Sequence, residues 1–392
     1  MSPMEAQVRR EQRQSKLEVR AHLSLPEMRN TPSRMFLNED AFVSMLYLER
    51  RRAERADNRF VLVLVDVKDL MSNSGRERMI EVLTKALSEA TRETDIVGWY
   101  LENSLMGVIG TQLGKATRDV VEKRFLEKLR SIFETTLGPE KSASISVSFH
   151  FFPEESTESG EDHTANIKLY PELEKRARAR RVPLAIKRCI DVAGSAAALV
   201  FLSPVFAAVA VAIKLTSEGP VLFKQKRLGQ HGKTFTVLKF RSMRMDCDAK
   251  IHRQYVEQFI AGQVNEKADS DERPVFKIQK DPRVTQVGRF IRKTSLDELP
   301  QFWNVLCGEM SLVGPRPPVP YEYHAYEVWH RRRVLEIKPG ITGLWQVKGR
   351  SRICFDDMVR LDLKYARAWS IWLDLKILAQ TPVAVIQGEG AH

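Results

Sequence analysis

The sequence has few of the residues that build metal centres and disulfide frameworks. Its four cysteines, Cys189, Cys247, Cys307 and Cys354, lie far apart and form no Cys-x-x-Cys pair. This spacing fits neither a structural zinc site nor a disulfide-bonded scaffold, and it favours a reducing compartment. The eight histidines include no His-Glu-x-x-His spacing, so no histidine-based metal site is predicted. The first residues are charged and contain no apolar run, which predicts no signal peptide.

Charge of one sign is in excess. The chain of 392 residues carries 62 Lys and Arg against 50 Asp and Glu, for a formal net charge of +12 at pH 7. An excess of this size either confers solubility or indicates an anionic partner, such as nucleic acid, an anionic lipid surface or a phosphorylated substrate. No zinc finger, RNA-recognition signature or helix-turn-helix context is present, so we predict no nucleic-acid partner. The length favours two domains.

The N-terminal half has the pattern of a compact α/β (α+β) domain. Residues 1–34 are polar and charged and are interpreted as a flexible arm. Apolar runs and helical spacing then alternate, and predict in order a strand, a helix, two strands, a helix and a strand at residues 60–67, 76–91, 95–100, 104–109, 115–136 and 142–152. This β-α-β-β-α-β order predicts a ferredoxin-like domain over residues 35–153.

The stretch TDIVGWYLENSLMGVI in this domain resembles a degenerate GGDEF (diguanylate cyclase-like) domain. Where an active cyclase carries its Gly-Gly-Asp/Glu-Glu-Phe hairpin, this sequence has Leu101-Glu102-Asn103-Ser104-Leu105. The metal-binding and nucleotide-binding groups of the family are therefore missing. The resemblance implies a regulatory or dimerising domain, with a homodimer as one arrangement, and a plain structural domain is the alternative.

A membrane element is predicted next. Residues 154–180 form an acidic, Ser/Thr-rich linker followed by a basic juxtamembrane segment. Val192 to Ile213 is a run of 22 uncharged residues, about the length that crosses a bilayer core. Ser203-Pro204 interrupts it, and basic residues flank both ends. Because basic flanks prefer the cytoplasmic side, we predict a re-entrant helix hairpin over about residues 187–214. A kinked spanning helix and a buried soluble helix are the alternatives.

From Lys187 to about Gln380 the sequence resembles the bacterial sugar transferase family, the monotopic polyprenyl-phosphate phosphoglycosyl transferases. The motifs that carry the resemblance, in order, are Lys187-Arg188-x-x-Asp191-x-x-x-Ser195, Gly219-Pro220-Val221, Gln225-x-Arg227-x-Gly229, Lys239-Phe240-Arg241-Ser242-Met243, Asp281-x-Arg283-x-Thr285-x-x-Gly288-Arg289, Ser295-Leu296-Asp297-Glu298-Leu299-Pro300-Gln301, Gly314-Pro315-Arg316-Pro317 and Lys338-Pro339-Gly340-Ile341-Thr342-Gly343-Leu344-Trp345-Gln346. The resemblance implies a membrane-associated catalytic domain over residues 181–392.

The pair Asp297-Glu298 is the predicted catalytic centre. Ser295-x-x-Glu298 also fits a capping box, which is a purely structural use of the same residues. At a helix N-terminus a carboxylate stays ionised and backbone N–H groups attract phosphate. The resemblance implies that Asp297 is the nucleophile toward the β-phosphate of a UDP-sugar, and that Glu298 helps to hold Mg²⁺. An ion bound by carboxylates and phosphate oxygens also suits a reaction in which two anions approach each other.

Basic residues are the predicted phosphate ligands. Arg316 lies between prolines in a stiff loop, which favours a pre-positioned guanidinium. Arg292, Lys239 and Arg241 are further candidates, for which surface charges or structural ion pairs are the alternatives. The remaining predicted residues are structural and shape or anchor the membrane hairpin: Ser203, Pro204, Arg188 and Asp191.

Taken with these patterns, the resemblance implies transfer of a hexose-1-phosphate from a UDP-sugar to polyprenyl (undecaprenyl) phosphate, with UMP release, at the cytoplasmic face of a bacterial inner membrane. The expected partners are the UDP-sugar, the polyprenyl phosphate and membrane lipid. A glycosyl transferase that releases UDP, and a membrane-anchored signalling or scaffold protein, are the alternatives. The motifs do not distinguish which sugar is transferred.

Overall fold

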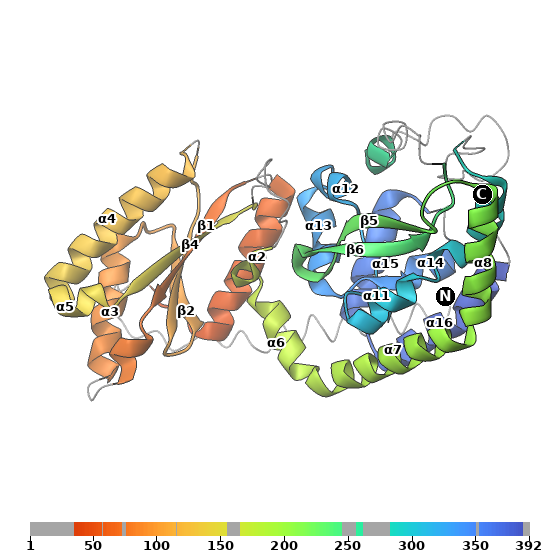
Figure 1. The fold of residues 1–392 in the computed structure, drawn as a ribbon. Coiled ribbons are helices and arrows are strands. Elements are labelled where there is room, and N and C mark those ends of the chain that lie inside the picture. Colours follow the sequence, from red (N-terminus) through yellow and green to blue (C-terminus); the bar gives the residue numbers. More distant parts are fainter. Residues whose placement is uncertain are drawn as a thin grey trace, which may run out of the picture. The chain divides into compact units, whose positions relative to one another are not determined.

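The computed structural model describes residues 35–56, 58–72, 76–114, 116–154, 165–244, 256–261, 283–349 and 353–386. The predicted arm, most of the predicted linker, and the motif residue Asp281 lie outside the described residues. The chain is a mixed α/β protein with an antiparallel sheet in its N-terminal part (Figure 1). The predicted domain boundaries stay predictions.

The N-terminal part is built on a four-stranded antiparallel sheet with the order β2-β3-β1-β4. Its elements are α2 (Glu39–Ala56), β1 (Phe60–Asp66), η1 (Lys68–Ser72), α3 (Arg76–Ala90), β2 (Ile96–Leu101), β3 (Leu105–Gly110), α4 (Arg118–Leu137), α5 (Pro139–Ala143) and β4 (Ser146–Phe152). The six elements predicted from the sequence are present in the predicted order. One boundary is wrong, because residues 139–143 form the short helix α5 and the last strand begins only at Ser146.

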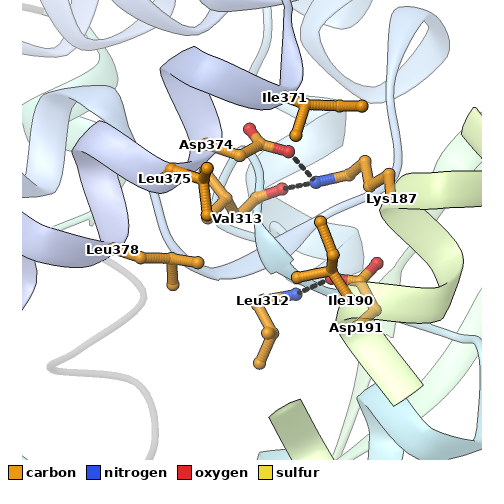
Figure 2. A pocket seen from close by; sticks show the side chains of 9 residues that line it. All are labelled: Lys187, Ile190, Asp191, Leu312, Val313, Ile371, Asp374, Leu375 and Leu378. Atoms are coloured by element: carbon orange, nitrogen blue, oxygen red, sulfur yellow. Dashed lines mark hydrogen bonds and ion pairs between the residues drawn. The ribbon is translucent and has the colours of Figure 1, made fainter. Parts of the chain in front are cut away.

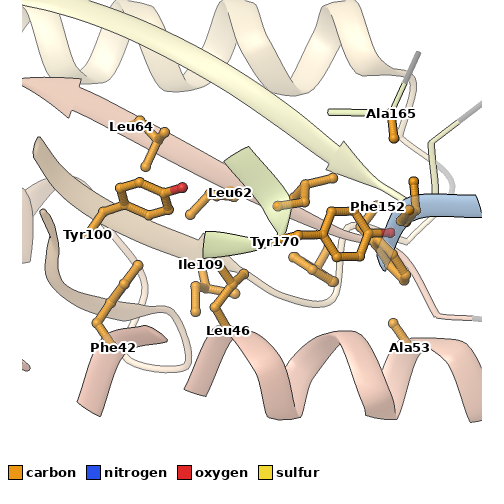
Figure 3. Packing of buried hydrophobic residues seen from close by; sticks show 13 residues of the cluster. Phe42, Leu46, Ala53, Leu62, Leu64, Tyr100, Ile109, Phe152, Ala165 and Tyr170 are labelled. Atoms are coloured by element: carbon orange, nitrogen blue, oxygen red, sulfur yellow. The ribbon is translucent and has the colours of Figure 1, made fainter. Parts of the chain in front are cut away.

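Strand β1 lies in the middle of this part and is buried along nearly its whole length. Such a run, apolar at every position, is typical of a strand covered on both faces. In Figure 1, α2 lies on one side of the sheet and α3 and α4 lie on the other. Figure 3 shows the α2 side, where Phe42 and Leu46 pack against Leu62, Leu64 and neighbouring core residues. The sheet and its helices therefore share one apolar core.

The C-terminal part begins with helices and contains two small sheets. Its elements are η2 (Ile167–Leu169), α6 (Pro171–Ala179), α7 (Arg181–Phe201), α8 (Ser203–Thr216), β5 (Leu222–Leu228), η3 (Gln230–Gly232), β6 (Thr234–Phe240), α10 (Gln286–Lys293), η5 (Leu296–Glu298), α11 (Gln301–Cys307), β7 (Ser311–Val313), α12 (Pro320–His324), α13 (Val328–Glu336), β8 (Gly340–Thr342), α14 (Leu344–Lys348), α15 (Phe355–Ala368) and α16 (Ile371–Ile386). β5 and β6 form an antiparallel ribbon, and β7 and β8 form a parallel pair.

The predicted membrane element is a broken helix. α7 ends at Phe201, and Pro204 lies in the first turn of α8, where a missing backbone N–H leaves no helix hydrogen bond unmade. The two helices are bent by 59°. A tight hairpin would require a nearly complete reversal, so the element is a wide V and not two antiparallel arms. Among the described residues no single helix has the length and apolar composition of a membrane span, whereas α7 and α8 together do.

Candidate active site

The carboxylate pair lies on a short turn between two helices. Asp297 and Glu298 belong to the 3-10 turn η5, three residues before α11 begins at Gln301. Ser295, which precedes the turn, has a left-handed backbone with φ of 57°. Its side chain makes no capping hydrogen bond, so the capping-box interpretation is wrong. A left-handed Ser295 is incompatible with the extended backbone that an N-cap adopts.

Apolar neighbours fix this turn against the broken helix. Leu296 and Leu299, on either side of the pair, pack against a cluster that includes Val209 and Ile213 of α8 and Phe240 of β6. The same cluster contains Ile291 of α10. The four core residues Val209, Ile213, Phe240 and Ile291 are buried, while Asp297 and Glu298 are half-buried, so the turn holds its carboxylates at the surface of a packed support.

Lys239 is the direct partner of Glu298. It lies at the end of β6, and its Nζ donates a hydrogen bond to Glu298 Oε1 at 2.9 Å. Asn304 fixes the strand beside it, because Asn304 Oδ1 accepts from the Leu238 N–H at 3.0 Å and Asn304 Nδ2 donates to the Thr236 carbonyl at 2.7 Å. The predicted phosphate ligand Lys239 is therefore held at the carboxylate pair by both β6 and α11.

Three cations surround the pair. Burial opposes ionisation of Glu298, but the positive charges of Lys239, Arg316 and Arg227 outweigh it and lower the pKa of Glu298 to about 2. Burial lowers the pKa of Lys239, and the charges of Glu298 and Asp297 act in the opposite direction. Both carboxylates are thus within electrostatic reach of Lys239. The sequence suggested that a helix N-terminus keeps this carboxylate ionised. In the structure, side-chain cations lower the pKa of Glu298 instead.

Arg316 is exposed in the loop Gly314–Pro318. Its positive charge lowers the pKa of both Glu298 and Lys239. Arg227 is buried, with 6% of its surface exposed, and its NH1 donates to the Pro317 carbonyl at 2.6 Å. We did not single out Arg227 or Asn304 from the sequence. In the sequence, Arg227 is a residue of the Gln225-x-Arg227-x-Gly229 motif and one of the basic residues after the apolar run, and no spacing signal marks Asn304.

Two predicted phosphate ligands have other surroundings. The Arg241 guanidinium is buried and donates to the Ser217 and Glu218 carbonyls at 2.8 and 2.6 Å, so it ties β6 to the end of α8. Its contacts favour an anchoring role. Arg292 is half-buried on α10, and no contact between it and the carboxylate pair is found within the described ranges. The phosphate-binding roles of both residues stay predictions.

The residues predicted to anchor the hairpin dock α7 on the C-terminal part. Arg188 donates to the Val305 and Leu306 carbonyls, the last turn of α11, at 2.6 and 2.8 Å. Asp191 accepts from the Leu312 N–H at 2.9 Å (Figure 2). At the bend, the Ser203 hydroxyl donates to the Val200 carbonyl at 2.8 Å, while Val200 and Phe201 are 69% and 80% exposed.

A buried ion pair that we had not predicted reinforces this docking. Lys187 Nζ lies 2.6 Å from Asp374 Oδ2 and donates to the Val313 carbonyl at 3.0 Å, as Figure 2 shows. Tyr365 donates to the second oxygen of Asp374 at 2.6 Å. An ion pair removed from water is costly unless further hydrogen bonds support it, and here Val313, Tyr365 and Trp369 supply them. The pair joins α7, β7 and α16 into one support beneath the site.

The carboxylates of the site suit a metal ion that is also bound by the substrate. They are too few to enclose a metal ion by protein ligands alone. Within the described part of the chain no group of three or more His, Cys, Asp or Glu side chains is arranged to hold a metal ion. Asp297 and Glu298 offer two adjacent carboxylates, which is the protein share that Mg²⁺ takes when phosphate oxygens supply the remaining ligands.

Comparison with known proteins gives a consistent result for the C-terminal part. The model of the bacterial sugar transferase family matches residues 182–388. Galactosyl transferase CpsE of Streptococcus agalactiae is 44% identical over 209 residues, which are 53% of this chain and 44% of that protein. Undecaprenyl-phosphate galactose phosphotransferase of Salmonella typhimurium is 41% identical over 217 residues, 55% of this chain and 43% of that protein. The chain thus spans less than half of the length of these two relatives.

A shorter relative is matched over most of its length. Exopolysaccharide production protein ExoY of Rhizobium meliloti is 39% identical over 209 residues, which cover 53% of this chain and 88% of ExoY. The N-terminal part resembles GGDEF-domain structures: a DGC protein from Thermotoga maritima is 23% identical, with a TM-score of 0.26, over 32% of this chain and 87% of that one. A likeness at that score carries no argument about activity.

Proposed function

Because the chain belongs to the bacterial sugar transferase family, we propose that it transfers a hexose-1-phosphate from a UDP-sugar to undecaprenyl phosphate and releases UMP. The observation that carries the proposal is the pair Asp297-Glu298, set among Lys239, Arg227 and Arg316. Three cations against two carboxylates leave an excess of positive charge, which suits an anionic diphosphate. The similarity to the Salmonella undecaprenyl-phosphate galactose phosphotransferase supports undecaprenyl phosphate as the carrier and a hexose as the sugar.

The proposed chemistry has two displacements at phosphorus. In the first, a carboxylate oxygen of Asp297 attacks the β-phosphorus of the UDP-sugar. The bond from that phosphorus to the bridging oxygen breaks, UMP leaves, and the sugar phosphate stays on Asp297 as an acyl phosphate. In the second, a phosphate oxygen of the carrier attacks the same phosphorus and the Asp297 carboxylate is released. The product is a polyprenyl-diphosphate sugar.

The surrounding residues have distinct proposed roles. Arg316, whose guanidinium is exposed, binds the donor phosphates and stabilises charge on the transferred group. Lys239 keeps Glu298 ionised and offers positive charge to the leaving UMP. Glu298 is the proposed Mg²⁺ ligand. When bound, the ion neutralises phosphate charge so that the donor and the carboxylates can approach.

We place the broken helix α7–α8 in the cytoplasmic leaflet of the inner membrane. A bend of 59° leaves about 121° between the arms, so arms of about 11 residues entering symmetrically reach about 8 Å deep. Exposed Val200 and Phe201 lie at the bend, where the insertion is deepest. Cysteines substituted for Ile186 and Thr216 should both react with an impermeant reagent added to the cytoplasmic side. Reaction from opposite sides would refute the placement.

For the N-terminal part we propose a regulatory or dimerising role without cyclase chemistry. In the structure, residues 101–105 connect β2 to β3, and Asn103 has a left-handed backbone with φ of 60°. The turn offers one carboxylate, Glu102, and none of the glycines of the cyclase motif. The alternative, a signalling or scaffold protein with a silent C-terminal part, predicts no nucleotide release at all.

The test is nucleotide release by the purified full chain in detergent. The protein is incubated with Mg²⁺, undecaprenyl phosphate and single UDP-sugars, and UMP and UDP are quantified separately. We expect UMP, dependent on the carrier under turnover conditions, from UDP-glucose, UDP-galactose or an N-acetylated relative. UDP in place of UMP would make the protein a glycosyl transferase. Absence of both nucleotides with every sugar would favour the scaffold alternative.

A further inference from the structure

The loop that carries Arg316 is held by its carbonyl groups. Three of its five residues, Gly314–Pro318, are prolines, which have no N–H to donate. Each carbonyl from position 315 to position 318 accepts a hydrogen bond. The donors, in that order, are the Gly340 N–H at 2.9 Å, Arg333 NH2 at 3.3 Å, Arg227 NH1 at 2.6 Å and the Leu228 N–H at 2.9 Å. The backbone on both sides of Arg316 is therefore fixed.

The first of these contacts belongs to a tight backbone crossing. A Cβ atom added to Gly340 would lie 2.0 Å from the Gly314 nitrogen, so the start of the loop is pressed directly on β8. No side chain is needed to hold that end. At the far end, the Arg227 side chain and the Leu228 amide supply hydrogen bonds to the Pro317 and Pro318 carbonyls.

Arg227 is bound on all sides by protein. Its Nε and NH2 donate to Gln225 Oε1 at 3.1 and 2.8 Å, and its NH1 donates to the Pro317 carbonyl. In the register of the β5–β6 ribbon, Arg227 pairs with Phe235 and Gln225 pairs with Val237. Alternate residues share one face, so both lie on the face that carries Lys239. The planar guanidinium thus links the ribbon face of Lys239 to the loop of Arg316.

Arg316, unlike the buried Arg227, is accessible to a substrate. Its guanidinium is exposed and, within the described part of the chain, makes no hydrogen bond or ion pair. It nevertheless acts on Glu298 through its charge, and it repels Arg227 and Lys239. Because the Arg316 guanidinium has no hydrogen bond of its own among the described residues, its position depends on where the loop backbone is held.

We propose that Arg227 is a positioning residue, which holds the Pro317 carbonyl and thereby keeps the Arg316 guanidinium at the Asp297–Glu298 turn for the donor diphosphate. The inference deepens the proposed function and rests on it. Arg227 is assigned a positioning role because it is buried, and because each of its three nitrogens already donates a hydrogen bond to Gln225 or to the Pro317 carbonyl. A lysine has one point charge and cannot make both contacts at once.

The test is a double-mutant cycle on the full chain, with UMP release as the readout. We expect Arg227→Lys to lower kcat/KM about 100-fold, the scale of a misplaced binding group, and Arg316→Gln to lower it about as much or more. If Arg227 acts through Arg316, the double variant is no slower than Arg316→Gln alone. Effects that multiply would overturn the proposal. Wild-type protein that releases no UMP would instead refute the proposed function, and the role assigned to Arg227 in binding the donor would be overturned with it.

A second measurement, which does not depend on enzymatic activity, tests whether Arg227 holds the loop Gly314–Pro318. The Leu228 amide donates to the Pro318 carbonyl, and the Gly340 amide donates to the Pro315 carbonyl at the other end of the loop. In Gln225→Leu, which removes the acceptor that orients Arg227, hydrogen exchange should become faster at Leu228 and stay unchanged at Gly340. Unchanged exchange at both amides would contradict the proposal, and faster exchange at both would show general loosening and also contradict it.

Discussion

Two turns of this chain each carry an acidic residue beside a left-handed backbone, yet only one is surrounded by the charges that chemistry needs. The turn between β2 and β3 has Glu102 next to Asn103, with φ of 60°. The turn η5 has Asp297 and Glu298 after Ser295, with φ of 57°. Glu102 is exposed, and its backbone N–H donates to Glu39 Oε2 at 2.8 Å. Glu298 lies among Lys239, Arg316 and Arg227.

The difference teaches that the surroundings make the site, since the turns themselves are similar. Three segments of the C-terminal part contribute to the second site. β6 and the loop Gly314–Pro318 each supply a cation, and α8 supplies apolar packing beneath the turn. The N-terminal turn projects from the sheet end, where solvent screens any charge brought near it.

The largest effect should separate the two turns. Asp297→Asn removes the proposed nucleophile and should lower UMP release by more than about 1,000-fold, because an amide cannot form the acyl phosphate. Glu102→Gln makes the same kind of change in the other turn and should leave the rate unchanged. Both variants are assayed at equal protein levels and membrane association. Wild-type rates of UMP release in Asp297→Asn would contradict its assignment as nucleophile, and the two turns would then not differ in function.

A smaller effect tests the surrounding charge. Lys239→Met should lower UMP release about 100-fold, a loss comparable to that of one preorganised donor. The matched control is Arg51→Met, which breaks the Arg51–Glu54 pair at 2.9 Å on α2 and should leave the rate unchanged. Equal rates for wild type and Lys239→Met would show that the ion pair with Glu298 is not used in catalysis.

The smallest effect is on stability in acid. The pKa of Glu298 is lowered from 4.5 to about 2, so its ionised form stabilises the fold above pH 4.5, and this stabilisation is lost as the pH falls toward 2. Wild-type protein should therefore lose more thermal stability between pH 5 and pH 3 than Glu298→Gln, in which this group does not titrate. Identical pH dependence of the two melting temperatures would mean that the lowered pKa contributes nothing.

The sequence predicted regular elements well and side-chain partners poorly. The apolar run of β1 and the helical spacing of α3 are local signals, and both elements lie within a residue or so of their predicted bounds. Residues 142–145 were assigned to a strand because they alternate in the sequence, but Pro139 starts a short helix there and delays β4. A proline in a first helical turn is favourable, and this local preference outweighs a weak alternation.

At the site, the sequence predicted the carboxylate pair and four candidate phosphate ligands, but it could not show which of these cations lie near the carboxylates. Lys239 lies on β6 and Glu298 on η5, 59 positions apart, and tertiary packing brings them together, including the packing of Leu296 and Leu299 on the cluster that contains Phe240. Arg241 has the same charge two residues on from Lys239, but it points to the end of α8. Strand alternation alone would place residues two apart on one face, but β6 ends at Phe240 and Arg241 lies beyond it, and the motif does not show where the strand ends.

The most direct test of the central claim is the burst of UMP in the absence of undecaprenyl phosphate. A covalent sugar phosphate on Asp297 requires the first displacement to proceed without the carrier. The account predicts about one UMP per active chain, no burst in Asp297→Asn, and transfer of the trapped sugar phosphate when the carrier is added. No UMP before the carrier is added, with normal turnover afterwards, would mean direct transfer between the two substrates and would contradict the assignment of Asp297 as nucleophile.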